Sequence, residues 1–299
     1  MILGIDIGGT NVKFGVCDEN FKIYDKYSIK TKKDDGDIAF VLSICEKINE
    51  IKKVYDIEKI GIGTPGTIDY KKGICIRAAN LPYKNTPMTD IIERETGLKS
   101  VVANDATCAV HGELYAGAGR EASNIAMITL GTGVGGGIII DKKVYTGKSG
   151  MAGEFGHFSI NFDGHPCPCG QKGCVEQYAS VTALIRQTKE AISENPDSLL
   201  AKMGENDVGG RTSFDAMRKG CPVAAKVVDR YTDYLTMAVL GINFIFQPDV
   251  VVIGGAISNE REYILKPIRE KLIREVDVRV SELGNDAGII GAAAICIKG

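Results

Sequence analysis

The stretch MILGIDIGGTNVKFGVCD, residues 1–18, is an apolar run that ends in two glycines and continues as an alternating segment. Both patterns predict β-strands, and the glycines predict a tight turn between them. A third alternating segment, FKIYDKYSIK at residues 21–30, follows a turn at Glu19 and Asn20. The chain is therefore expected to open with three antiparallel strands.

Strands and helices alternate after this opening. Apolar residues at helical spacing from Asp37 to Val54 predict a helix, and KIGIGTPG at residues 59–66 predicts a strand. A second helix is expected at residues 87–96, followed by a strand at 100–105 and a helix that begins near Asp105. This alternation predicts the α/β fold class, in which helices cover a sheet.

The pattern begins again after Gly117. NIAMITLGTGVGGGIIID, residues 124–141, repeats the strand, glycine turn and strand of residues 1–18. The segments beyond it predict a cysteine-rich loop, helices at 175–194 and 223–246, a buried strand at 248–257 and a small-residue helix at 285–298. Two related halves are therefore expected, with a boundary near residues 117–124.

Composition narrows the classes of partner. The 299 residues are 44% hydrophobic and 25% charged, with a formal net charge of -2, which is ordinary for a soluble globular protein. There is no excess of positive charge to neutralise nucleic-acid phosphates, no apolar run long enough to span a membrane, and no signal-peptide pattern. We expect a cytoplasmic protein that binds small molecules, with neither nucleic acid nor membrane as a partner.

The nine cysteines do not suggest a disulfide framework, because their number is odd and the cytosol keeps thiols reduced. Six of them are isolated in the sequence and are expected to be small buried side chains. These six are Cys17, Cys45, Cys75, Cys108, Cys221 and Cys296. Only the cluster CPCGQKGC at residues 167–174 suggests further chemistry.

This cluster and the upstream GEFGH at residues 153–157 supply the ligand types and number of a closed tetrahedral zinc site. The candidate ligands are His157, Cys167, Cys169 and Cys174. His165 is a rival ligand, and a redox-active thiol pair or unligated loop cysteines are alternatives. The redox alternative is disfavoured because no Cys-X-X-Cys opens a helix. Four protein ligands leave no open position, so such a metal would hold a loop and not activate water.

Three glycine-rich turns follow predicted strands: DIGGT at residues 6–10, LGTGVGGG at 130–137 and IGGA at 253–256. Glycine lets backbone N–H groups approach a phosphate closely. Each turn, taken alone, could equally be an ordinary hairpin turn. The sequence contains no P-loop ending in Gly-Lys-Ser or Gly-Lys-Thr, so the three turns together are the candidate nucleotide site.

Seven segments in order resemble the ROK family of sugar kinases and sugar-responsive repressors. They are DIGGTNVKFGV, GIGTPGTID, NDATCAVHGE, LGTGVGGGIIID, GEFGHFSI, CPCGQKGCVEQYAS and VVIGGAI. The resemblance covers the whole chain. It implies a two-domain actin-like or hexokinase-like ATPase fold with a ribonuclease H-like motif and an interdomain cleft. The implied domains are residues 1–118 plus 286–299, closed by the C-terminal helix, and residues 119–285, which carry the zinc loop.

The resemblance also implies ATP-dependent phosphorylation of a hexose hydroxyl, at O6 of glucose or a related hexose, with Asp105 as general base. From the sequence alone, Asp105 could instead be a helix cap. The implied sugar ligands are Gly66, Asn80, Asn104, Asp105, Glu154, His157 and Glu176. His157, preferred over His165 as zinc ligand, would then contact both metal and sugar. A solvated loop or helix start remains the alternative for both glutamates.

For the nucleotide, the resemblance implies that Asp6 holds Mg2+ directly or through water. It places Gly8, Gly9 and Thr10 at the β- and γ-phosphates, Gly131, Thr132 and Gly133 over them, and Gly254 and Gly255 against the adenosine. Lys13 would neutralise phosphate or face solvent.

One departure from the family pattern concerns the substrate. Family members that phosphorylate glucose often carry Gly-Trp after an Asn-Leu, whereas this chain reads NLPYKN at residues 80–85 and has no tryptophan. Tyr83 could serve as the apolar wall in its place. N-acetylmannosamine, N-acetylglucosamine, mannose, fructose, allose and β-glucosides therefore remain alternative substrates. A sugar-responsive regulator is disfavoured because the chain starts at the first phosphate turn, and the family suggests a homodimer or homotetramer.

Overall fold

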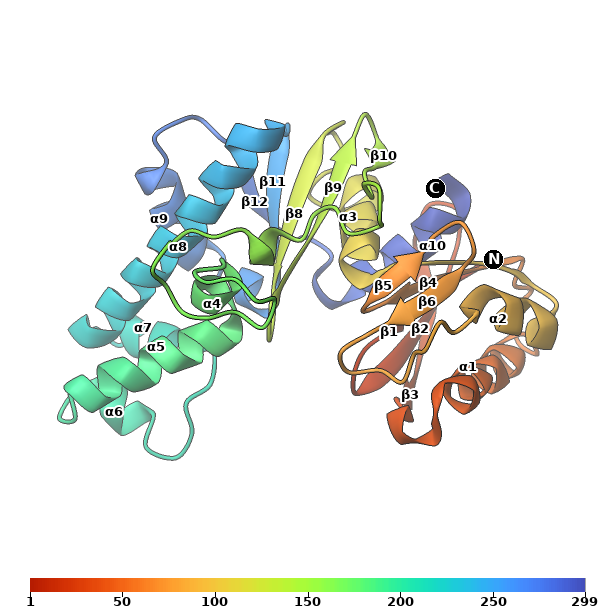
Figure 1. Ribbon diagram of the computed structural model, residues 1–299, viewed down its shortest axis with the longest axis horizontal. Coiled ribbons are helices and arrows are strands. Elements are labelled where there is room, and N and C mark those ends of the chain that lie inside the picture. The colour runs from red at the N-terminus through yellow and green to blue at the C-terminus, as the bar shows by residue number, and fades with distance from the viewer. Residues whose placement is uncertain (299) are drawn as a thin grey trace. The chain divides into compact units, whose positions relative to one another are not determined.

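The computed structural model describes residues 1–298, which form two compact units (Figure 1). The first comprises Met1–Ile125, Gly137–Gly153 and the chain from Asn285 onward. The second comprises Ala126–Gly136 and Glu154–Gly284. Residues 137–153 thus lie in the first unit, although the expected ranges place them in the second. Gly137 packs directly on Val110, which belongs to the first unit.

The first unit contains a five-stranded sheet of order β3-β2-β1-β4-β7. Its strands are β1 (Ile2–Ile7), β2 (Asn11–Cys17), β3 (Ile23–Lys30), β4 (Lys59–Thr64) and β7 (Lys99–Asn104). The pairs β1–β2 and β2–β3 are antiparallel, as predicted for the opening, while β1–β4 and β4–β7 are parallel. The connecting helices α1 (Asp37–Ile51) and α2 (Met88–Thr96) confirm the predicted strand and helix alternation.

The two faces of this sheet differ because side chains alternate along each strand. Leu3, Ile5 and Ile7 of β1 join the buried apolar residues of α1 and α2 in one core. On the other face, a Cβ at Gly4 would collide with the Ile289 carbonyl of α10 (Ala287–Lys298), and one at Gly61 would collide with that of Ala292. Because glycines occupy these positions of β1 and β4, the predicted small-residue helix packs directly against the sheet, beside α3 (Asp105–Ala116).

The second five-stranded sheet has the order β10-β9-β8-β11-β12. Its strands are β8 (Ile125–Leu130), β9 (Val134–Ile140), β10 (Lys143–Val144), β11 (Val250–Gly255) and β12 (Val278–Val280). When the strands of each sheet are numbered by their order in the chain, both sheets have the spatial order 3-2-1-4-5. The predicted repeat is confirmed, because β1–β2 and β8–β9 hold the same places in their sheets.

Apart from β8, β11, β12 and the start of β9, the second unit consists mostly of helices, of which α8 (Pro222–Phe246) is the longest (Figure 1). The others are α4 (Glu176–Ala179), α5 (Val181–Glu194), α6 (Leu199–Met203), α7 (Thr212–Arg218) and α9 (Glu262–Lys271). The prediction of one helix over 175–194 is wrong. Ser180 interrupts it with extended backbone, and its side chain accepts a hydrogen bond from Ala183 N as the N-cap of α5.

Several short elements were not predicted from the sequence. They include β10, β12, α6 and α7, the hairpin of β5 (Thr67–Asp69) and β6 (Ile74–Arg77), and the 3-10 helices η1 (Lys33–Asp35), η2 (Phe155–His157), η3 (Ala256–Glu260) and η4 (Gly284–Asp286). Of the six isolated cysteines, five are buried as expected, and Cys296 is partly buried.

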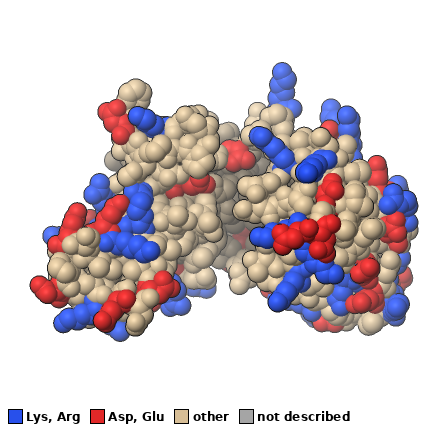
Figure 2. Space-filling view, turned by 60° about the horizontal axis from the view of Figure 1, so that its bottom comes forward, with Lys and Arg blue, Asp and Glu red and all other residues tan. Residues whose placement is uncertain are grey.

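The surface of each unit carries charges of both signs. On the face shown in Figure 2, Lys and Arg residues are interspersed with Asp and Glu residues on both units. Within residues 1–298, no helix combines the length and apolar character that crossing a membrane requires.

One buried histidine gives the fold a pH dependence. His111 of α3 is only 3% exposed, and its Nδ1 is a buried atom without a hydrogen-bond partner. Burial lowers the pKa of His111 to about 4 from an ordinary 6.5. The folded state therefore keeps this imidazole neutral over a range in which the unfolded chain binds a proton.

The stability that His111 contributes is complete above about pH 6.5 and is lost as the pH falls from there towards 4. We expect wild-type protein to lose roughly 2 kcal/mol of unfolding free energy through this group between pH 7.5 and pH 5. Urea denaturation of wild type and His111→Leu at both pH values measures the difference. Equal losses in the two proteins would show that His111 is not responsible.

Candidate functional site: two glycine turns, a carboxylate edge and a metal cluster

The carboxyl ends of β1, β4 and β7 meet at one edge of the first sheet. In the strand register, Asp6 lies beside Gly63, and Thr64 lies beside Asn104. Neighbouring strands are about 4.8 Å apart, so the backbones of Asp6 and Asn104 are about 10 Å apart. The predicted magnesium ligand and the predicted base at Asp105 therefore share one edge of the sheet.

Asn104 and Asp105 occupy different positions at the start of α3: Asn104 precedes the helix and Asp105 is its first residue. Asn104 is the N-cap, since its Oδ1 accepts hydrogen bonds from Ala106 N at 2.9 Å and Thr107 N at 3.4 Å. Its Nδ2 donates to the Gly66 carbonyl at 3.2 Å, which joins two of the predicted sugar ligands. The cap considered for Asp105 thus belongs to Asn104, and Asp105 is the partly exposed first residue of the helix.

The first glycine turn lies at the same edge. Gly8 N donates to Asn11 O at 2.9 Å, and the Thr31 hydroxyl donates to Gly8 O at 2.7 Å. Gly9 and Thr10 are exposed. A Cβ placed on Gly9 would lie 3.9 Å from the Cβ of Asn80, so the predicted sugar ligand Asn80 is next to the predicted phosphate turn.

Asp6 is a partly buried carboxylate whose environment suits a cation. Burial raises the pKa of Asp6, and the positive charge of Lys13 opposes that rise. The Lys13 Nζ lies 3.6 Å from Asp6 Oδ2, so Lys13 faces this carboxylate from the paired strand. Oxygen ligands are those that Mg2+ prefers, and a cation would lower the cost of keeping Asp6 ionised.

Tyr83 is buried in the first unit and does not form the apolar wall of a sugar site. It is only 4% exposed, its hydroxyl is 2.8 Å from that of Thr64, and its ring is 6.2 Å from the ring of Phe40. The prediction of Tyr83 as an apolar wall for the sugar is therefore wrong. Its hydroxyl finds a buried partner, so the ring packs in the core of the first unit.

In the second unit, two predicted nucleotide turns adjoin each other. Residues 131–133 connect β8 to β9, and Gly131 N donates to Gly133 O at 3.0 Å. Gly255, at the end of β11 next to Gly254, has a φ of 83°, and a Cβ there would collide with the Leu130 carbonyl. Only glycine fits this close approach to the end of β8.

Two of the predicted sugar ligands of the second unit, Glu176 and His157, lie close to Val134, the first residue of β9. Glu176 Oε2 accepts a hydrogen bond from Val134 N at 3.0 Å. Gly156, which precedes His157 in η2, lies so close to the Val134 carbonyl that a Cβ would collide with it. His157 is partly buried, and Glu154 is exposed just before η2.

The predicted metal ligands form one cluster in which all four ligand atoms lie within 4.8 Å of one another: those of His157, Cys167, Cys169 and Cys174. Cys167 Sγ is 3.7 Å from His157 Nδ1, and Cys169 Sγ is 3.6 Å from Cys174 Sγ. Zinc bonds of about 2.3 Å to sulfur and about 2.0 Å to nitrogen place tetrahedral ligand atoms about 3.5–3.8 Å apart. The two separations fit that geometry.

Backbone hydrogen bonds shape the loop that carries these sulfurs. Cys167 N donates to Gln171 O and Gly173 N to His165 O, both at 2.8 Å. Gly170 and Gly173 have φ values of 94° and 72°, as expected for glycines that bend the loop. The rival ligand His165 lies outside the cluster, because its Nε2 is 2.6 Å from Arg186 Nη1.

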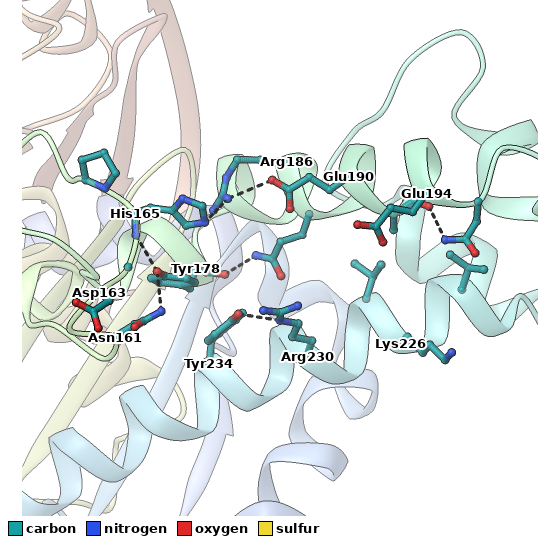
Figure 3. Close-up of a pocket in the computed structure, with 17 residues that line it drawn as sticks. Asn161, Asp163, His165, Tyr178, Arg186, Glu190, Glu194, Lys226, Arg230 and Tyr234 are labelled. Carbon is teal, nitrogen blue, oxygen red and sulfur yellow. Dashed lines mark hydrogen bonds and ion pairs between the residues drawn. The ribbon is translucent and has the colours of Figure 1, made fainter.

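A pocket of about 790 Å³ lies beside this loop, between it, α5 and α8 (Figure 3). The Tyr178 hydroxyl accepts hydrogen bonds from His165 N at 2.9 Å and Asn161 Nδ2 at 3.2 Å. Arg186 donates to Gln177 O at 2.6 Å. The pocket lining, drawn from the described residues, includes none of the predicted sugar or nucleotide ligands. Its polar contacts instead fix the loop to α4 and α5.

The sequence model of the ROK family matches residues 2–298. The glucokinase of Thermotoga maritima is 37% identical over 98% of this chain and 96% of its own length, and that of Halalkalibacterium halodurans is 35% identical over 97% and 92%.

Among solved structures, a ROK family glucokinase from Streptomyces griseus in complex with glucose and AMPPNP superposes with a TM-score of 0.83. It is 34% identical, and the match covers 98% of both chains. The family match extends over nearly the whole chain, and the curated relatives exceed 30% identity over nearly their whole length. This chain belongs to the ROK family.

Proposed function

We propose that this protein is an ATP-dependent hexose kinase that phosphorylates O6 of glucose or a closely related hexose. The observation that carries the proposal is the shared sheet edge that holds Asp6, Asn104 and Asp105. Support comes from relatives named glucokinase and from a solved relative that holds glucose and an ATP analogue.

In the proposed reaction, Asp105 accepts the proton of the sugar hydroxyl as its oxygen attacks the γ-phosphorus of ATP. The new oxygen–phosphorus bond forms as the bond from that phosphorus to the bridging oxygen breaks, and ADP leaves. Phosphoryl transfer depends mostly on positioning and charge compensation. Asn104 supports the base by capping α3, and Gly66, Asn80, Glu154, His157 and Glu176 are the proposed sugar ligands.

The proposed nucleotide ligands are backbone groups of the three glycine turns, Gly8, Gly9 and Thr10, Gly131, Thr132 and Gly133, and Gly254 and Gly255. Asp6 would hold Mg2+, which supplies neutralisation of phosphate charge when bound. Lys13, 3.6 Å from Asp6, is placed to add a second positive charge there.

We also propose that His157, Cys167, Cys169 and Cys174 hold a structural Zn2+. His157 Nδ1 faces the sulfurs, which leaves Nε2 as the nitrogen that can contact a sugar hydroxyl. Glu176 follows Cys174 by two residues. A rigid metal loop would therefore fix two sugar ligands at once.

An ADP-release assay over a panel of hexoses and hexosamines tests the kinase activity. The comparison substrates are N-acetylmannosamine, N-acetylglucosamine, fructose and a β-glucoside. We expect sugar-dependent ADP release that is fastest with glucose. ADP release that no sugar accelerates would refute the proposal.

We further propose a homodimer or homotetramer. Large apolar side chains surround one groove on the second unit: Phe162 is 91% exposed and Ile273 76%, with Met237 and Phe244 beside them. Exposed apolar patches of this kind mark interaction surfaces. Light scattering on purified protein measures the mass, and a monomer at all concentrations would refute this.

A further inference from the structure

The turn at residues 131–133 is tied to one short segment, residues 176–182. Val181 N donates to Gly131 O at 2.8 Å. The Thr182 hydroxyl donates to Thr132 O at 2.8 Å. On the far side of the turn, Val134 N donates to Glu176 Oε2 at 3.0 Å. Three successive peptide units of the turn are thus hydrogen-bonded to the first residue of α4 and the first two residues of α5.

These bonds set the direction of two N–H groups. A planar trans peptide points its C=O and N–H in opposite directions, and no described peptide bond is cis. The carbonyl of Gly131 faces α5, so the N–H of Thr132 points away from α5. The carbonyl of Thr132 is held by Thr182, so the N–H of Gly133 also points away. The turn therefore presents two adjacent donors on its outer side.

The segment that holds the turn is itself fixed. The buried Tyr231 hydroxyl donates to Ala179 O at 2.7 Å, and Gln187 Nε2 donates to Tyr178 O at 2.9 Å. Ser180 caps α5 two residues before Thr182. Val175 N, directly before the segment, donates to Phe158 O at 3.0 Å, next to the candidate metal ligand His157. The support for the turn therefore extends into the core of the second unit.

We infer that Thr182 is a positioning residue for nucleotide binding: it orients the Thr132–Gly133 peptide so that its N–H faces the phosphates of ATP. The inference rests on the proposed function, in which this turn contacts phosphate. Donors oriented before binding avoid the ordering cost that a mobile turn would incur on binding. The inference predicts a defect in nucleotide affinity that leaves sugar affinity unchanged.

The test compares Thr182→Val, which keeps the shape and removes the hydroxyl, with Thr182→Ser, which keeps the hydroxyl. Ser193→Ala, on an exposed site of the same helix, is the control. Loss of one hydrogen bond weakens binding by about three- to tenfold. For Thr182→Val, we expect the AMPPNP affinity measured by calorimetry to fall by this factor. The KM for ATP should rise by the same factor. Thr182→Ser and Ser193→Ala should match wild type.

In all three variants, glucose affinity and kcat should stay within about twofold of wild type. The thermal midpoint should change by less than about 2 °C. If wild type binds AMPPNP and Thr182→Val binds it equally well, the inference is wrong while the proposed kinase function stands. If Thr182→Val weakens glucose and AMPPNP alike, its role is structural and the inference is again wrong. If wild type binds no AMPPNP, both the inference and the proposed function fail.

Discussion

Asp105→Asn is expected to lower kcat by about 10²- to 10⁴-fold, the usual contribution of a positioned general base. Asparagine keeps the size of the side chain and a hydrogen-bond acceptor but cannot take up the hydroxyl proton. The fold should tolerate the change, because the N-cap of α3 is Asn104 and Asp105 only begins the helix. Sugar affinity should stay within a fewfold of wild type.

Steady-state ADP release gives kcat, and equilibrium titration with glucose gives the affinity. Asp90→Asn is a matched control, because Asp90 is also an aspartate in the first turn of a helix of the first unit, α2. It should leave kcat unchanged. Turnover retained in Asp105→Asn would remove Asp105 as the base, and loss of turnover in both variants would point to a general effect of lost charge.

The sequence predicted the parts of the fold that depend on local pattern. The apolar run and the two alternating segments of residues 1–30 predicted β1, β2 and β3, and the recurring pattern of strand, glycine turn and strand predicted the repeat between β1–β2 and β8–β9. Asp6 lies near the carboxyl end of β1 and Asp105 directly follows β7, and pairing with β4 sets the direction of both strands, so their common edge follows from the α/β order. The cluster of His157 with Cys167, Cys169 and Cys174 was predictable because cysteine and histidine residues at metal-ligand spacing are recognisable in a sequence.

Features that depend on contacts between distant residues were not predictable. The segment 175–194 contains no glycine or proline, so nothing local marks the break at Ser180. The break is stabilised by Tyr231, which lies 52 residues beyond Ala179. Tyr83 can be buried in the core because its hydroxyl forms a hydrogen bond with the hydroxyl of Thr64. Thr182 was missed for the same reason: a threonine at a helix start has no distinctive pattern, and its partner Thr132 is 50 residues away.

Cys174→Ser is expected to abolish stoichiometric zinc binding and to lower the thermal midpoint of the protein. Cys174 is fully buried, and its sulfur faces Cys169 at 3.6 Å. Without a cation, burial is the main cause that raises the pKa of Cys174 to about 12, whereas a bound metal would keep it as thiolate. A loss of several kcal/mol shifts the midpoint by roughly 10 °C in a protein of this size.

Metal analysis of purified protein measures zinc per chain, expected near one for wild type and near zero for Cys174→Ser. Cys221→Ser is the matched control, since Cys221 is a buried thiol of the same unit at the N-cap of α8, where serine is favoured. Glucose affinity should fall in Cys174→Ser alone, because Glu176 and His157 lose their rigid support. Full glucose affinity in a zinc-free variant would show that the metal loop does not position the sugar ligands.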